Sequence, residues 1–176
     1  MSYKFTKSQY FRPQKIILIE KNMPTFSLIV KENILSIIPL LKILYPEVNE
    51  EVLALRLNEM ILQGYQCLGI YENNNLIGTS GLWIKTKYYV GKHIEPDNVI
   101  VLPEYRNKGI GTSLMNWIYE YGRAQGCVAS ELNCYVSNDR GIKFWHGQGF
   151  NIIGCRFQKL FNGSKSTNRK KVKIMK

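Results

Sequence analysis

The sequence lacks the features that would place this protein in a membrane or a secretory pathway. Its longest apolar stretch, residues 34–46, contains Pro39 and Lys42 and is shorter than the roughly 20 residues that a spanning helix needs. The first 15 residues carry no apolar run of the kind found in secretory signals. We therefore expect a cytoplasmic protein that does not associate with membranes.

Paired cysteines and metal-binding patterns are also missing. Four cysteines lie apart in the chain, form no C-x-x-C pair and each sit in an apolar run: Cys67, Cys127, Cys134 and Cys155. Spacing of this kind favours small buried hydrophobic residues over disulfides or zinc ligands. His93 and His146 show no ligand spacing either, so the sequence predicts no metal site.

Acidic residues are scarce, with 13 Asp and Glu against 24 Lys and Arg, which leaves a net charge of +11. The excess is concentrated at the ends of the chain. Residues 1–22 hold five basic groups and one acid, and residues 162–176 hold six basic groups and no acid. We therefore predict an N-terminal extension (1–22), one nearly neutral domain (23–161) and a flexible basic tail (162–176), in which nucleic acid is not the main partner.

Hydrophobic periodicity within residues 23–161 predicts both strands and helices. The predicted helices cover 33–45, 49–64, 109–126 and 138–148. The predicted strands cover 25–30, 65–72, 76–85, 97–101, 127–136 and 150–161. Three consecutive asparagines between the second and third strands favour a hairpin turn, because asparagine tolerates positive φ. This order indicates an α+β fold in which helices cover a mixed sheet.

One junction between a strand and a helix has the composition of an anion site. The segment VLPEYRNKGIGTSLMNWI, residues 101–118, places two glycines in the first turn of a predicted helix. The first backbone N–H groups of a helix have no partners within it, and Gly109 and Gly111 present no side chains to block an approaching group. Arg106 and Lys108 add positive charge, so we expect a phosphate or pyrophosphate here.

Two common phosphate-binding motifs do not fit this junction. A P-loop requires a lysine after its glycines, whereas Lys108 precedes them. A dinucleotide-binding fingerprint requires a third glycine, and Leu114 stands at that position. The expected phosphate or pyrophosphate therefore binds through neither of these two motifs.

Two segments of the chain resemble the GNAT superfamily of acyl-CoA-dependent N-acyltransferases. RNKGIG, at residues 106–111, resembles the R/Q-x-x-G-x-G/A signature, and V-x-P-x-Y-R precedes it as is common in that family. VSNDRGIKFWHGQGF, at residues 136–150, resembles the N-x-x-A-x-x-F-Y-x-x-x-G-F segment. The element order over residues 24–161 is similar as well. The resemblance implies the GNAT fold, a central mixed and mostly antiparallel sheet flanked by helices.

The resemblance also implies where the cosubstrate acetyl-CoA would bind. Its pyrophosphate would lie on the backbone N–H groups from Lys108 to Thr112, and its pantetheine arm would pair with the strand at 99–101. The implied cofactor-binding residues are Val99, Ile100, Val101, Arg106, Asn107, Lys108, Gly109, Ile110, Gly111, Thr112, Asn138 and Phe144. The alternative for Arg106 and Lys108 is a solvated loop charge, and the alternative for Asn138 is a helix cap, which it can combine with binding.

Transfer of an acetyl group to an amine requires a base, because an amine with a pKa of about 10.4 is almost fully protonated at neutral pH. The family resemblance directs attention to the strand before the signature, where simple alternation places Glu95, Asp97, Val99 and Val101 on one face. Glu95 is the first candidate base and Asp97 the second. The alternative is that Asp97 is a turn residue at the start of the strand and that Glu95 faces water.

The sequence departs from the family where a proton donor would stand. Family members often carry a tyrosine after the phenylalanine of the second segment, but here Trp145 follows Phe144, and an indole is not a useful acid. Either the thiolate leaves unaided or Tyr135 protonates it. The oxyanion would meet a backbone N–H where the strand splays near Val99 or Ile100.

We therefore predict an acetyl-CoA-dependent N-acetyltransferase that acts on a primary amine by direct attack in a ternary complex. Two alternatives remain, a CoA-binding module without turnover and a nucleic-acid-associated protein that acts through its basic ends. The sequence reveals neither the acceptor nor whether the protein forms a homodimer.

Overall fold

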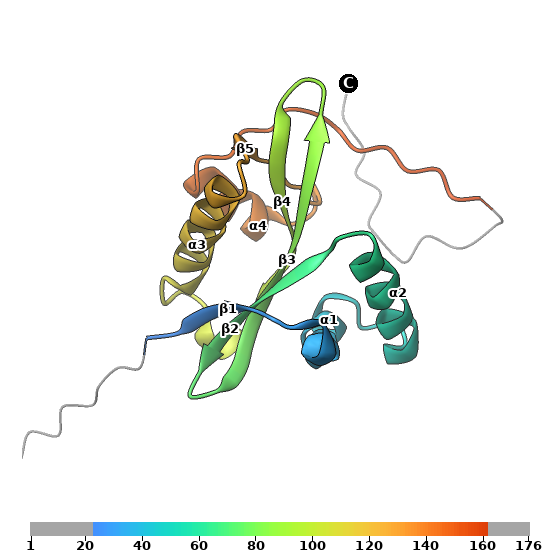
Figure 1. Ribbon diagram of the computed structural model, residues 1–176, viewed down its shortest axis with the longest axis vertical. Helices are drawn as coiled ribbons and strands as arrows, with labels where there is room; N and C mark the ends of the chain where they lie inside the picture. Colours follow the sequence, from blue (N-terminus) through green and yellow to red (C-terminus); the bar gives the residue numbers. More distant parts are fainter. Residues whose placement is uncertain (1–22, 162–176) are drawn as a thin grey trace, which may run out of the picture.

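The computed structural model describes residues 23–161 of the chain (Figure 1). The predicted extension at 1–22 and the predicted basic tail at 162–176 lie outside the described residues. No helix within the described part has the length and apolar character needed to cross a bilayer.

A five-stranded sheet forms the centre of the fold, with its strands in the order β1-β2-β3-β4-β5. The strands are β1 (Thr25–Leu28), β2 (Gln66–Glu72), β3 (Asn75–Lys87), β4 (Gly91–Val101) and β5 (Ala129–Ser130). The first three junctions are antiparallel, and β4 and β5 run parallel. The predicted mixed, mostly antiparallel sheet is thereby confirmed.

Helices cover both faces of this sheet (Figure 1). On one face lie the 3₁₀-helix η1 (Lys31–Ile37) and the helices α1 (Ile38–Leu44) and α2 (Glu50–Leu62). On the other lie α3 (Ile110–Ala124) and α4 (Asp139–Gly147), and the short η2 (Pro103–Tyr105) connects β4 to α3. Pro39 lies in the first turn of α1, where a backbone N–H has no partner within the helix, so its missing N–H costs no hydrogen bond.

Each face of the sheet has its own buried core. Towards α3, Leu68, Ile70, Leu82 and Ile94 pack with Leu114, Met115 and Ile118 of the helix. Towards α1 and α2, Tyr65 and Cys67 pack with Ile34, Ile37, Ile38, Leu41, Leu53 and Leu57. Ile94 of β4 belongs to the core towards α3, and α1 contacts β4 on the other face.

The predicted hairpin between β2 and β3 is confirmed. Asn73 and Asn74 adopt φ values of 51° and 64°, both in the left-handed region. Such values at both central positions suit a tight hairpin, because they follow the right-handed twist of the paired strands.

Two strand predictions are wrong. The strand expected at 127–136 is reduced to Ala129–Ser130, and residues 151–160 have no regular structure, with Ile152, Ile153 and Phe157 exposed. Apolar composition alone does not make a strand, because the backbone groups also need a neighbour with which to pair. The expectation of buried cysteines holds only for Cys67, because Cys127 and Cys134 are half-buried and Cys155 lies exposed in this segment.

Candidate active site

The N-terminus of α3 is open and rich in free backbone donors. Gly109 precedes the helix with φ at 80°, a left-handed conformation that favours glycine, and no side chain caps the helix. The first backbone bond of α3 runs from the Ser113 N–H to the Gly109 carbonyl at 3.0 Å. The N–H groups of residues 110–112 therefore point out of the helix end, where the helix dipole favours an anion.

Three cationic side chains surround this helix end. Arg106 and Lys108 come from the loop before α3, and Arg140 from the first turn of α4. Arg140 donates to the Asn107 side chain at 3.0 Å, which joins α4 to the loop before α3. None of the three belongs to an ion pair within residues 23–161. Their charge is thus available to a bound phosphate.

Helix α4 packs against the same end of α3. A Cβ atom at Gly111 would lie 3.1 Å from the ring of Phe144, so the absence of a side chain at Gly111 allows this contact. Gln148 also donates to the Thr112 hydroxyl at 3.2 Å. Asn138 caps α4 by accepting from the Gly141 N–H at 2.9 Å, which confirms the capping alternative for this residue. Its role towards CoA stays a prediction.

A bulge in β4 changes which side chains share a face. Asp97 and Ile100 are three positions apart, yet they pair with β3 residues that are only two apart. Ile100 therefore shares the face of Glu95 and Asp97, and Val99 and Val101 do not. The predicted alternation of these four residues on one face is wrong, because a bulge inserts one residue and reverses the pattern beyond it.

The same bulge determines which backbone groups lie on the β5 side of β4. Before it, the carbonyls of Lys92 and Ile94 accept from the segment that contains β5. After it, the Val101 carbonyl turns to that side and accepts from Arg106 Nε at 2.8 Å. By the two-residue repeat of a strand, Val99 presents its backbone there too. Since β4 and β5 pair only at residues 93–94 and 129–130 of the described chain, this edge of β4 is open.

Asp97 lies at the bulge in a half-buried, aromatic setting. It is opposite Gly81, and the phenol of Tyr65 covers that glycine. The rings of Tyr65 and Trp83 are 4.9 Å apart. Burial raises the pKa of the Asp97 carboxyl, although hydrogen bonds from the Asn98 backbone and the Trp83 side chain oppose the rise. A carboxylate in this position binds a proton more readily than one in water.

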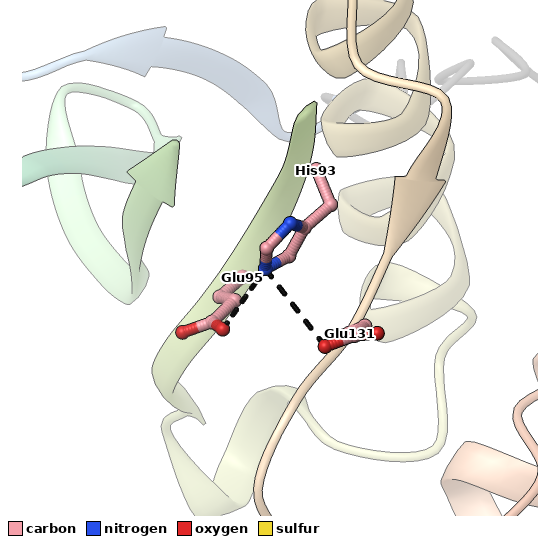
Figure 2. A group of neighbouring side chains, drawn as sticks. All are labelled: His93, Glu95 and Glu131. Carbon is pink, nitrogen blue, oxygen red and sulfur yellow. Dashed lines mark hydrogen bonds and ion pairs between the residues drawn. The ribbon is translucent and has the colours of Figure 1, made fainter. Parts of the chain in front are cut away.

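Glu95 lies two residues before Asp97 on the same face of β4, within a cluster of charged side chains. Lys85 and Lys87 each contact it at 2.7 Å, and Lys87 also reaches Glu131 at 2.8 Å. Figure 2 shows His93 beside both carboxylates, 3.1 Å from Glu95 and 3.8 Å from Glu131. Burial raises the pKa of Glu95, but the bonds from Lys85, Lys87 and His93 outweigh it and lower the pKa to about 2.

His93, Glu95 and Glu131 form a group whose ligand atoms lie within 4.8 Å of one another, close enough to hold a metal ion. Lys87 bridges the two carboxylates, however, and with Lys85 it balances their charge. A metal ion would have to displace it. Sequence analysis missed this group because Glu131 reaches it only through the pairing of β5 with β4.

The region of the expected proton donor holds Tyr135 and Trp145. Tyr135 is 51% exposed, and its carbonyl accepts from the Asn138 N–H at 2.8 Å. Trp145 packs edge-on against Phe144 and Phe150 at centroid distances of 4.8 and 5.6 Å. The tryptophan therefore has a packing role, whereas about half of the Tyr135 side chain is exposed.

Comparison with known proteins identifies the family. The model of the Acetyltransferase (GNAT) family matches residues 34–150, which include the β4 edge, the α3 terminus and α4. The chain belongs to the GNAT acetyltransferase family. Among curated proteins no match was found.

Solved structures of GNAT proteins show the same fold. The ribosomal-protein-alanine N-acetyltransferase of Brucella melitensis biovar Abortus 2308 is 16% identical with a TM-score of 0.68, over 80% of this chain and all of that one (100%). Glucosamine-6-phosphate N-acetyltransferase of Arabidopsis thaliana is 21% identical with a TM-score of 0.61, over 80% and 99%. AAC(6')-Iy, solved with the bisubstrate analogue CoA-S-monomethyl-acetylneamine, is 18% identical with a TM-score of 0.68, over 80% and 99%.

Proposed function

We propose that this GNAT protein transfers the acetyl group of acetyl-CoA to a primary amine of a small molecule, peptide or protein in a ternary complex. The observation that carries the proposal is the position of the open α3 N-terminus directly after the open edge of β4. A free strand edge that is followed directly by an anion site suits a ligand with two parts. An amide-containing arm would pair with the strand edge, and a diphosphate would bind at the anion site. Structures of AAC(6')-Iy with CoA and with a CoA analogue support this choice of ligand.

The diphosphate would lie on the N–H groups of residues 110–112, with Arg106, Lys108 and Arg140 around it. The pantetheine arm would then run along β4 and pair with the backbone of Val99 and Val101. Arg106 joins the two parts of this site, because its Nε already holds the Val101 carbonyl.

Asp97 is the better candidate for the base, ahead of Glu95. Glu95 is held by three donors that stabilise its charge, so it has little affinity for a proton. Asp97 combines a raised pKa with a position at the bulge, near the backbone of Val99. A base of higher pKa accepts a proton from an ammonium group more effectively.

The proposed reaction is a direct attack. Asp97 takes a proton from the substrate ammonium, directly or through water, and the amine nitrogen then bonds to the thioester carbonyl carbon. The Val99 N–H would stabilise the resulting oxyanion. As this intermediate collapses, the nitrogen gives up its second proton to solvent and the C–S bond breaks. The released thiolate of CoA takes a proton from solvent or from Tyr135. A thiol with a pKa near 8.5 can leave without a dedicated acid.

The decisive experiment measures thiol release from acetyl-CoA with a panel of primary amines. With an amine that is accepted, Asp97→Asn should lower kcat/KM by about 10²- to 10⁴-fold, a range typical of a lost base. CoA affinity should remain, because Asp97 does not contact the α3 site. CoA binding without thiol release on any amine would favour the alternative of a non-catalytic CoA-binding module.

Tyr135→Phe tests the proton donor separately. If the hydroxyl protonates the thiolate, turnover falls while CoA affinity stays constant. An unchanged rate would remove Tyr135 from the mechanism and leave the unaided departure of the thiolate.

A further inference from the structure

The bulge in β4 is built on a left-handed asparagine. Two residues of β4, Asn98 and Val99, lie opposite Ser80 alone, and Asn98 has φ at 49°. Glycine adopts this conformation without steric cost, whereas asparagine adopts it less readily. If only the backbone mattered, glycine would be the better residue here, so the side chain of Asn98 needs an explanation.

That side chain makes contacts in three directions. Its Nδ2 donates to Asp97 Oδ2 at 3.0 Å and lies 3.4 Å from the Tyr65 hydroxyl. Its Oδ1 accepts a short hydrogen bond from the hydroxyl of Tyr45, at the C-terminal end of α1. Asn98 thus connects the bulge to the helical layer that covers this face of the sheet.

Asn98 holds both oxygens of the Asp97 carboxylate. The Asn98 backbone N–H donates to Oδ1 at 2.9 Å, while Nδ2 donates to Oδ2. Each carboxylate oxygen has two lone pairs, so one on each is used by Asn98. Asn98 therefore contacts both oxygens, the Trp83 side chain is a further donor to this carboxylate, and a lone pair remains to accept a proton.

We propose that Asn98 is a positioning residue for the acetyl transfer proposed above. Its left-handed backbone turns the Val99 N–H towards the open edge of β4, and its side chain holds the Asp97 carboxylate against α1. One residue thereby sets the positions of both the oxyanion donor and the base. This inference rests on the proposed function.

Two substitutions separate the backbone role from that of the side chain. Asn98→Gly keeps access to the left-handed conformation and removes the side-chain contacts, whereas Asn98→Ala removes both. For Asn98→Gly we expect kcat to fall about 10- to 100-fold, less than the roughly 10²- to 10⁴-fold expected when the base itself is lost, with CoA affinity within about threefold of wild type. Asn98→Ala should also weaken CoA binding, because it disturbs the β4 edge.

The pH dependence supplies a readout that a purely structural role would not change. Loss of the Nδ2 bond removes a donor that stabilises ionised Asp97, so the acid limb of the kcat/KM profile should move to higher pH in Asn98→Gly. Other groups that act on Asp97 remain present in all variants: Tyr65, Cys67, Trp83, Lys85 and Arg156. Asn74→Gly replaces another left-handed asparagine, in the β2–β3 turn, and should change neither rate nor profile.

A ¹³C titration of the Asp97 carboxyl keeps the inference testable without turnover. Its midpoint should be higher in Asn98→Gly than in wild type, whether or not an accepted amine has been found. An unmoved midpoint, or wild-type kcat in Asn98→Gly, would overturn the side-chain role. Equal CoA affinity in Asn98→Gly and Asn98→Ala would overturn the backbone role. Failure of the proposed function itself would appear differently, as absent thiol release by the wild-type protein.

Discussion

The phenol of Tyr65 occupies the space that a Cβ atom at Gly81 would take. Tyr65 is almost fully buried at the start of β2, and Gly81 lies in the middle of β3. The hydroxyl end of the ring therefore lies over Gly81 and forms one wall around Asp97, which pairs with Gly81. Packing of this kind couples the stability of the sheet to the shape of the candidate site.

Gly81→Ala should consequently destabilise the protein. The added methyl group forces Tyr65 out of its position in a filled core, and overpacking of this type costs about 1–3 kcal/mol. Urea unfolding measures the loss. Gly147→Ala is the matched control, because nothing lies within 4 Å of a Cβ there. If both variants had wild-type stability, Tyr65 would not lie over Gly81 as described.

Arg106→Ala should weaken CoA binding. The substitution removes a cation from the α3 end and frees the Val101 carbonyl that its Nε holds. Loss of a charge-assisted bond costs about 1.5–3 kcal/mol, which corresponds to roughly 10- to 150-fold in Kd. Calorimetric titration with CoA measures it, and Arg56→Ala on the exposed side of α2 should have no effect. Unchanged affinity in Arg106→Ala would refute the placement of the diphosphate.

Gly111→Ala should act mainly through α4. Its Cβ would lie 3.1 and 3.2 Å from two ring atoms of Phe144, so the ring must shift by a few tenths of an ångström. We expect a stability loss on the order of 1 kcal/mol. In a double-mutant cycle, the stability loss caused by Gly111→Ala should be smaller when Phe144→Leu is also present. Strict additivity of the two substitutions would show that the residues do not contact each other.

Glu95 should make stability depend on pH in the acid range. Its pKa is about 2 in the folded protein, below its ordinary value near 4.5. Its contribution is thus complete above about pH 4.5 and is lost as the pH falls from there towards 2. Glu95→Gln should lower the unfolding free energy at pH 7 and flatten the curve over that window. Glu120→Gln, at an exposed carboxylate of α3, should leave the curve unchanged.

The open, electropositive N-terminus of α3 could be predicted from the sequence because its parts are neighbours in the chain. Gly109 supplies the left-handed turn before the helix, and Arg106 lies three residues earlier. The hairpin at Asn73 and Asn74 was predictable for the same reason. In each case the conformation depends on a few consecutive residues, so periodicity and turn chemistry are sufficient.

The site around Asp97 could not be predicted in the same way. A strand read by simple alternation places Asp97 on the same face as Val99, and only the pairing of β4 with β3 reveals the extra residue at Asn98. Most asparagines have a negative φ, so the identity of residue 98 does not by itself predict the positive φ of Asn98. Sequence alone therefore ranked Glu95 above Asp97 as the candidate base, because it does not show that two lysines contact Glu95 and neutralise its charge.

The sequence by itself determined the family, the order of most elements and the electropositive start of α3, because these follow from short segments. The tertiary structure decided the bulge, the charge cluster around Glu95 and the short extent of β5. Each of these depends on which strands meet and in what register, and residues far apart in the chain set that register together. The chemistry proposed for this protein depends on both, since the local signature would hold the cofactor and the non-local pairing would place the base.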